Sequence, residues 1–322
     1  MPLTDLTLDD CLAYRPELPA PADFDVFWSR TLAYAESAVP APDLRLVDNG
    51  LALIDTYDVT VAGFDGHSVR GWLRVPAGTT GPLGCVVEFL GYGRGRGLPH
   101  ENLLYPAAGY AHFLMDTRGQ GWSAAPGDTA DPAPGPSGTV PGFLTRGVDS
   151  AENHYYRRLF ADAVRWTEAA RALSVVDPDR IVVTGFSQGG GMALAVAGLV
   201  PGLAAVMPDV PFLCHIRRGA EIASEPPYTE IAQYLALHRD RTEQVFSTLS
   251  YFDAAHFAAR ADAPALFSIA LMDPICPPST CFTAYHRYTG EKSVEVYAFN
   301  GHEGGGRVHE RAQLAFVRDR IG

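Results

Sequence analysis

The chain reads Ile181-Val182-Val183-Thr184-Gly185-Phe186-Ser187-Gln188-Gly189-Gly190-Gly191, and this stretch predicts its fold. A β-branched run leads to a glycine, a serine follows two positions later, and small residues lead into an apolar segment. Strand, sharp turn and helix in this order are typical of a nucleophile elbow with Ser187 at an exposed apex. Gly185 and Gly189 fit such a turn because larger side chains would collide across it. The alternative is a glycine-rich strand-to-helix turn with an incidental serine.

A catalytic serine in this fold is followed along the chain by an acid and then by a histidine. His302 is the best-placed histidine, because its glycine-rich segment 300–306 comes directly after the strand-like run 293–299. His309 lies on the amphipathic terminal segment 307–321, and we expect it at the surface. Three other histidines lie in expected helices and favour structural roles: His215, His238 and His286.

Asp273 is the first candidate for the acid, because it ends the buried-strand pattern of residues 263–271. Its carboxylate would hold the His302 ring in the productive tautomer. Asp209 is the serious alternative, since it follows the strand-like run 203–207; it would otherwise hold the loop that comes after it. Two further aspartates precede the 263–271 strand rather than follow it: Asp253 and Asp262.

An oxyanion hole requires two backbone N–H groups. One should come from Gln188, directly after the serine, and our candidate for the other is Tyr92. Tyr92 lies in the glycine-rich loop 91–97 that follows the strand-like run 84–90, and glycines let backbone amides approach a ligand closely. A phosphate-binding loop is the competing interpretation, but the loop lacks a Gly-Lys-Ser/Thr ending and dinucleotide spacing.

Three ordered motifs resemble one known family: Arg118-Gly119-Gln120-Gly121, Gly185-Phe186-Ser187-Gln188-Gly189 and Gly301-His302-Glu303. This is the acetyl xylan esterase / cephalosporin-C deacetylase family, carbohydrate esterase family seven, of the α/β-hydrolase superfamily. The likeness covers nearly the whole chain. It includes the blocks 24–28, 140–147, 155–158, 209–215, 249–253 and 271–280.

The resemblance implies a catalytic triad of Ser187, Asp273 and His302, and it therefore disfavours Asp209. It also implies oxyanion donors at Tyr92 and Gln188, walls of a small acyl pocket at Tyr92, Phe212 and Ile275, and a structural turn at Arg118, Gly119 and Gln120 that braces the loops of the serine and histidine. The family further implies a homo-oligomer, a hexamer built from trimers or dimers. His256 stands where the family usually has asparagine, and we expect only local consequences.

Strand-like and helical segments alternate along the chain, which predicts an α/β-hydrolase fold with a mostly parallel sheet and helices on both faces. The runs 54–62 and 68–75, joined through Asp65-Gly66, predict an antiparallel edge hairpin near the amino terminus. The helix expected at 155–173 follows a plausible capping pair, Asp149 and Glu152. We expect one domain over 1–322, with an ordered Pro- and Gly-rich excursion at 124–142 and a helical cap insertion at 215–260.

The composition disfavours several classes of partner. The net charge of −12, from 25 basic and 37 acidic residues, argues against nucleic acid and anionic membranes. Five cysteines without metal-ligand spacing predict neither a disulfide framework nor a zinc site: Cys11, Cys85, Cys214, Cys276 and Cys281. Residues 1–6 show no signal peptide, and no apolar run is long enough to span a bilayer, so we expect a cytoplasmic protein.

Together these features predict a serine esterase that removes acetyl groups from small acetylated carbohydrates and cephalosporin C through an acetyl-enzyme, with no metal or organic cofactor. A short-chain carboxylesterase, lipase or peptidase with the same triad is one alternative. An inactive binding protein on the same scaffold is the other, although all three triad candidates are present.

Overall fold

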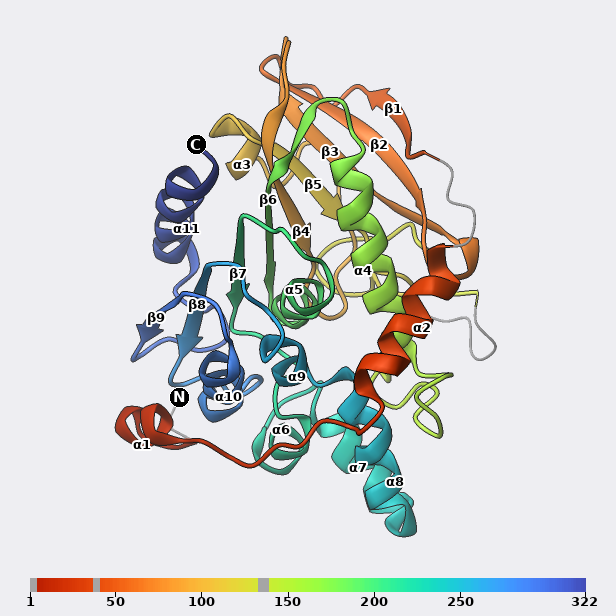
Figure 1. Ribbon diagram of the computed structural model, residues 1–322, viewed down its shortest axis with the longest axis vertical. Helices are drawn as coiled ribbons and strands as arrows, with labels where there is room; N and C mark the ends of the chain where they lie inside the picture. Colours follow the sequence, from red (N-terminus) through yellow and green to blue (C-terminus); the bar gives the residue numbers. More distant parts are fainter. Residues whose placement is uncertain (1–4, 37–40, 133–138) are drawn as a thin grey trace.

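A nine-stranded sheet runs through the computed structural model, which describes residues 5–36, 41–132 and 139–322 (Figure 1). The strand order is β1-β2-β3-β5-β4-β6-β7-β8-β9. The strands are β1 (Asp43–Val47), β2 (Ile54–Ala62), β3 (Ser68–Pro76), β4 (Leu83–Phe89), β5 (Ala111–Met115), β6 (Val176–Phe186), β7 (Ala205–Asp209), β8 (Ala265–Ala270) and β9 (Lys292–Tyr297).

The sheet is parallel from β5 to β9 and antiparallel from β1 through β3 to β5. The expected hairpin is present as β2 and β3, paired from Ile54↔Pro76 to Ala62↔Ser68. It does not form the edge, however, because β1 pairs with the outer side of β2. The sequence analysis missed β1 because four of its five residues are exposed, which leaves no buried face to impose an apolar pattern.

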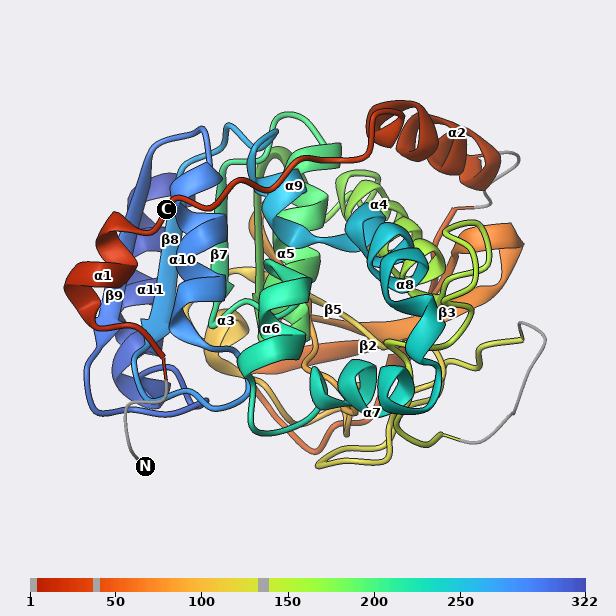
Figure 2. The ribbon, with the colours of Figure 1, turned by 90° about the horizontal axis from the view of Figure 1, so that it is seen from below.

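Helices cover both faces of the sheet, as predicted (Figures 1 and 2). The larger apolar core lies against α4, α5, α9 and α10, and a smaller one lies under α3 and α11. The helices are α1 (Leu8–Ala13), α2 (Phe24–Glu36), α3 (Leu104–Ala107), α4 (Tyr155–Arg171), α5 (Gln188–Leu199), α6 (Ile216–Ile222), α7 (Thr229–Leu237), α8 (Thr242–Leu249), α9 (Ala254–Ala258), α10 (Pro278–Arg287) and α11 (Gly306–Ile321). Across the described ranges, no helix combines the length and apolarity needed to cross a membrane.

Strand β6 shows why the central strands read as continuous apolar runs. Val182 packs into the core under α11, whereas Val183 packs into the core under α5, and both are fully buried. A parallel strand with helices on both sides has no solvent face, so the polar alternation disappears. This pattern made the strand recognisable and places its carboxyl end, at Phe186, in the middle of the sheet.

The segment between β7 and β8 contains helices α6 to α9, where the sequence analysis expected an insertion at 215–260. Residues 133–138 of the excursion expected at 124–142 lie outside the described residues, and so do residues 1–4. The first part of this excursion is anchored, because the backbone N–H groups of Asp128 and Thr129 donate to Asp116 at 2.6 and 2.8 Å.

The N-terminus of α4 is capped differently from the prediction. His154, rather than an Asp149–Glu152 pair, is the N-cap residue, and its Nδ1 accepts a hydrogen bond from the Tyr156 N–H at 3.2 Å. The other ring nitrogen lies 3.1 Å from the Leu144 carbonyl. Burial lowers the pKa of His154 to about 4, so the ring is neutral and can act as both donor and acceptor.

His256 is fully buried in α9, and neither of its ring nitrogens has a hydrogen-bond partner among the described residues. Its ring packs edge-on against Phe24, with 5.7 Å between centroids. Burial, helped by the charges of Arg287 and Arg260, lowers the pKa of His256 to about 3. The neutral ring is thus a feature of the core between α2 and α9.

We expect His256→Asn to reduce the loss of stability in acid. The unfolded chain binds a proton at this imidazole near pH 6.5, but the folded protein does so only near pH 3, so the free energy of unfolding falls as the pH drops through this interval. Between pH 7 and pH 5 the free energy of unfolding, measured with urea, should fall by about 2 kcal/mol less in the variant than in the wild type. If both proteins show the same pH dependence of stability, the lowered pKa assigned to His256 is wrong.

Candidate active site

The elbow places Ser187 at the carboxyl end of β6, in a backbone conformation that few non-glycine residues adopt. Its φ is 58° and its ψ is −116°. Such a conformation costs about 1–3 kcal/mol and persists only where its surroundings enforce it. Here the Ser187 N–H donates to the Asp209 carbonyl at 2.9 Å, and the Ser187 carbonyl accepts from the Phe212 N–H at 2.9 Å.

The two glycines of the elbow are required by close backbone contacts, as the sequence analysis inferred. A Cβ at Gly185 would lie 2.3 Å from the backbone of Gly189, and one at Gly189 would lie 2.0 Å from the Phe89 carbonyl oxygen. Ser187 itself differs from the expectation of an exposed apex, because only 3% of it is accessible. The surrounding loops therefore close over the serine.

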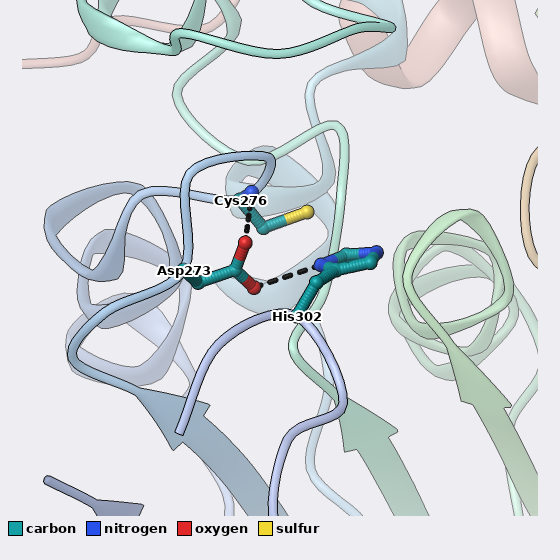
Figure 3. Close-up of side chains that lie close together, drawn as sticks. All are labelled: Asp273, Cys276 and His302. Atoms are coloured by element: carbon teal, nitrogen blue, oxygen red, sulfur yellow. Dashed lines mark hydrogen bonds and ion pairs between the residues drawn. The ribbon is translucent and has the colours of Figure 1, made fainter. Parts of the chain in front are cut away.

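Asp273 and His302 form a hydrogen-bonded pair beside the elbow (Figure 3). His302 Nδ1 lies 2.8 Å from Asp273 Oδ2. The other oxygen, Oδ1, accepts the N–H groups of Ile275 and Cys276 at 2.8 and 2.9 Å. Asp273 is fully buried, so these three bonds fix its orientation and hold the His302 ring.

Two contacts place this pair next to Ser187. The His302 ring packs edge-on against Phe186, the residue before the serine, with 4.9 Å between centroids. The Cys276 sulfur lies within 4.8 Å of the ligand atoms of Asp273 and His302. Burial raises the pKa of the Cys276 thiol well above its usual range, and a hydrogen bond with the Ser187 side chain acts in the opposite direction.

Asp209, the alternative acid, is engaged elsewhere. Its two carboxylate oxygens accept hydrogen bonds from His309 Nε2 at 2.8 Å and Gln313 Nε2 at 2.7 Å, and both donors lie on α11. The expectation that His309 lies at the surface was wrong, since the residue is only 2% exposed and also contacts the Tyr297 hydroxyl at 3.0 Å. The Asp209 carboxylate thus joins β7 to the terminal helix.

The two candidate oxyanion donors lie on segments that meet at the elbow. Gln188 is the first residue of α5, and Tyr92 follows the end of β4. Within the described residues, neither backbone N–H has a hydrogen-bond acceptor. Free N–H groups at a helix start favour negative charge, which is the property an oxyanion site requires.

The turn Arg118-Gly119-Gln120 connects these segments. Gln120 accepts the Gly93 N–H at 2.6 Å and donates to the Gln188 side chain at 2.9 Å. Arg118 is fully buried and binds Asp162 through two nitrogens at 2.5 and 2.8 Å. These hydrogen bonds reach the Tyr92 loop and the elbow rather than the His302 loop, which the resemblance had included.

The Tyr92 side chain is held by a residue that the sequence analysis missed. Its hydroxyl donates to Glu230 Oε1 at 2.7 Å and accepts the N–H groups of Gly142 and Phe143 at 3.1 and 3.0 Å. Glu230 belongs to α7, and burial raises its pKa. Nothing in the local sequence marks Glu230, because the contact joins segments 138 positions apart.

The predicted acyl walls lie around the same loops. Phe212 is fully buried, and its ring is 6.4 Å from Tyr92 and 4.4 Å from Tyr228, measured between centroids. Ile275 is half-buried and is positioned through its N–H by Asp273. All three proposed walls are therefore tied to the residues that hold the candidate catalytic groups.

Asp273, Cys276 and His302 are also the group of side chains in the described ranges with the spacing of a metal site (Figure 3). The Asp273 oxygens already accept three hydrogen bonds, from the His302 ring and from the N–H groups of Ile275 and Cys276. Asp273 already binds His302 Nδ1, which leaves Nε2 available. This arrangement favours proton transfer at Nε2 over metal binding.

We expect Glu230→Ala to lower kcat/KM for aryl acetates by about tenfold, because the Tyr92 hydroxyl would lose its acceptor and the loop its anchor. A buried hydrogen bond to a charged group contributes about 1.5–3 kcal/mol, so the melting temperature should fall too. Glu225→Ala, at an exposed neighbouring position, is the matched control. If the melting temperature falls while kcat/KM stays unchanged, Glu230 stabilises the fold but has no part in the reaction.

Comparison with known proteins agrees with the resemblance seen in the motifs. A family model described as acetyl xylan esterase (AXE1) matches residues 1–320. The solved acetyl xylan esterase from Paenibacillus sp. R4 is 38% identical, with a TM-score of 0.92 over 98% of this chain and 100% of that chain. Acetyl xylan esterase 1 from Thermoanaerobacterium sp. JW/SL YS485 is 32% identical, with a TM-score of 0.89 over 98% of this chain and 99% of that chain.

A curated relative, acetyl esterase Axe7A of Xylanibacter ruminicola, is 25% identical over 307 residues, which are 89% of this chain and 65% of that protein. The chain therefore spans slightly less than two thirds of the length of this relative. The sheet and these likenesses define the class of protein, a carboxylic ester hydrolase with the α/β-hydrolase fold. The chain belongs to the acetyl xylan esterase (AXE1) family, which confirms the family predicted from the motifs.

Proposed function

We propose that the protein is a serine esterase that removes acetyl groups from small acetylated carbohydrates, with acetylated xylo-oligosaccharides as the main substrates and cephalosporin C as a further one. The observation that carries this proposal is the hydrogen bond between His302 and Asp273 beside the elbow serine. Family membership supports acetyl esters as the substrate class.

The first half-reaction transfers the acetyl group to the enzyme. The Ser187 oxygen attacks the acetyl carbonyl carbon while His302 Nε2 takes the hydroxyl proton. Asp273 holds the proton on Nδ1 and stabilises the imidazolium. When the tetrahedral intermediate collapses, the bond to the sugar oxygen breaks and His302 returns its proton to that oxygen.

The backbone N–H groups of Tyr92 and Gln188 would stabilise the negative charge on the carbonyl oxygen. Each such donor contributes roughly 3–4 kcal/mol to the transition state in comparable sites. In the second half-reaction, His302 removes a proton from water, and the hydroxide attacks the acetyl-enzyme. When this second tetrahedral intermediate collapses, the bond between the acetyl carbon and the Ser187 oxygen breaks, His302 gives its proton to Ser187, and acetic acid leaves. These steps use only side chains, backbone and water.

Two alternatives remain for the same arrangement: a broader short-chain carboxylesterase or peptidase, and an inactive binding protein. Hydrolase-fold binding proteins tend to lack a triad member. Here Ser187, Asp273 and His302 are all present, and Asp273 is hydrogen-bonded to His302. The two enzyme classes differ in the acyl group that they accept, so acyl length is the discriminating measurement.

We expect the wild-type enzyme to prefer 4-nitrophenyl acetate to the butyrate and to reject the octanoate. Phe212 is fully buried against Tyr228, so the proposed wall cannot retreat from a longer chain. A methylene that fits a pocket gains about 1–3 kcal/mol, whereas one that meets a rigid wall is excluded. Phe212→Ala should flatten the profile of kcat/KM against acyl length. A preference for octanoate over acetate would replace the deacetylase proposal with a lipase-like one.

A further inference from the structure

Cys276 contacts the candidate triad on every side, although the mechanism above gives it no task. Its backbone N–H donates to Asp273 Oδ1 at 2.9 Å. Its sulfur lies within 4.8 Å of the ligand atoms of Asp273 and His302, and in Figure 3 its side chain points toward the His302 ring. A hydrogen bond also joins the sulfur to the Ser187 side chain. The residue therefore lies where it can affect the reaction.

The backbone of Cys276 is fixed independently of its side chain. Its N–H is held by Asp273, and its carbonyl accepts a hydrogen bond from the Cys281 thiol at 3.7 Å. Two prolines follow directly, Pro277 and Pro278, and each proline ring fixes a φ angle of the chain. Cys276 is only 1% exposed, so its side chain has little room to move. A substitution of similar volume at this position therefore changes the sulfur without moving the loop.

The Ser187 hydroxyl has a different partner from the one that the reaction requires. Within the part of the chain that the structure describes, its hydrogen bond is with Cys276, and none joins it to the His302 ring. Hydrogen bonds to a catalytic base are often long in an unliganded enzyme and tighten only when substrate binds. The hydroxyl must therefore leave the sulfur and turn to His302 Nε2 before it can attack an ester.

We propose that Cys276 is a positioning residue for the transfer of the acetyl group to the enzyme: its thiol holds the resting Ser187 hydroxyl and releases it to His302 when an ester binds. A thiol suits this task because its sulfur is a weak acceptor and its S–H a weak donor. Burial raises the pKa of this thiol, so a neutral S–H group faces the serine. This inference rests on the serine mechanism proposed above.

The two half-reactions should respond differently to a change at Cys276. In the first, the Ser187 hydroxyl must leave the sulfur before it attacks. In the second, the serine oxygen is bonded to the acetyl carbon and carries no proton, and water is the nucleophile. Asp273 and His302 serve both half-reactions. A change that merely distorted the triad would therefore slow both, whereas the role proposed for Cys276 concerns only the first.

Cys276→Ser tests this role, because it replaces a weak hydrogen-bonding partner with a stronger one of similar size. We expect the rate constant of acylation by 4-nitrophenyl acetate, measured by stopped flow, to fall by about five- to tenfold, an effect of the size of one ordinary hydrogen bond. The rate constant of deacylation should stay within about twofold of wild type. Cys276→Ala, which removes the partner, should acylate at least as fast as wild type.

Cys11→Ser is the matched control. Cys11 is also fully buried, and its thiol donates to the Leu6 carbonyl at 3.7 Å, but it lies on α1. Both of its rate constants should match those of the wild type. Acylation of Cys276→Ser within twofold of wild type, or an equal fall in acylation and deacylation, would overturn the proposal. If thermal unfolding shows that Cys276→Ser does not fold, Cys276→Ala decides: acylation slowed more than about threefold overturns the proposal, and any faster rate supports it.

A fluorophosphonate tests the same hydroxyl without an acetyl ester. The Ser187 oxygen bonds to phosphorus, His302 takes the hydroxyl proton, and the P–F bond breaks as fluoride leaves. We expect the rate constant of inactivation to fall by about five- to tenfold in Cys276→Ser and to be unchanged in Cys11→Ser. If the wild-type protein reacts with the fluorophosphonate but cleaves no acetyl ester, the proposed function fails, and these inactivation rates still decide the role of Cys276. If acetyl esters are cleaved and neither acylation nor inactivation changes in Cys276→Ser, the inference fails while the esterase function stands.

Discussion

Replacement of Ser187 by alanine is expected to lower kcat for aryl acetates by at least about 10⁴-fold, the largest effect of any single change in this protein. The loss follows because no other hydroxyl lies at the apex of the elbow, beside the His302 ring and the free N–H groups of α5. The fold should be retained, because the backbone of Ser187 is held by Asp209 and Phe212 through main-chain bonds that alanine also makes.

A serine-directed fluorophosphonate gives an independent measurement. Intact-mass analysis should show one adduct on the wild-type protein and none on Ser187→Ala, while the thermal unfolding curves of the two proteins nearly coincide. Ser224→Ala, at an exposed serine, serves as the control and should behave as wild type in both assays. Activity of Ser187→Ala within tenfold of wild type would remove Ser187 from the proposed mechanism.

The sequence predicted those features that depend on neighbouring residues. The elbow was recognisable because Gly185 and Gly189 avoid backbone contacts that any larger residue would make. This constraint acts within five consecutive positions of the sequence. Asp273 was found by its place after the buried strand β8, and His302 by its place after the strand-like run that forms β9. Parallel strands bring their carboxyl ends to one edge of the sheet, so position in the chain was sufficient to predict that the two side chains meet.

Other features depend on contacts between distant segments, which local patterns do not encode. Glu230 reaches Tyr92 from an inserted helix, and His309 is buried because Asp209 lies opposite it across 100 positions of sequence. The amphipathic pattern of residues 307–321 predicts His309 at the surface. In the structure His309 is buried, because its ring pairs with the Asp209 carboxylate. Ser187 is closed from solvent for the same reason, since the loops over it come from other parts of the chain.

The choice between two carboxylates is the part of the site most open to direct test, and Asp273→Asn should decide it. Asp273 Oδ1 accepts two backbone N–H groups, so the asparagine oxygen would take that place and its NH₂ would face His302 Nδ1. His302 would then carry its proton on Nε2 and could not accept one from Ser187. We expect kcat to fall by about three to four orders of magnitude, with little loss of stability.

Asp209→Asn should show the opposite pattern. Its carboxylate accepts one hydrogen bond from His309 and one from Gln313, and an asparagine can accept only one of them, so the anchoring of α11 should weaken by about 1–3 kcal/mol. Ser187 depends on the main-chain carbonyl of Asp209, which the substitution retains, so kcat should stay within about tenfold of wild type. Kinetics and urea unfolding of both variants provide the comparison. A large loss of kcat in Asp209→Asn with near-normal kcat in Asp273→Asn would mean that Asp209, not Asp273, serves as the acid, because only the acid that fixes the His302 tautomer affects the rate without first affecting the fold.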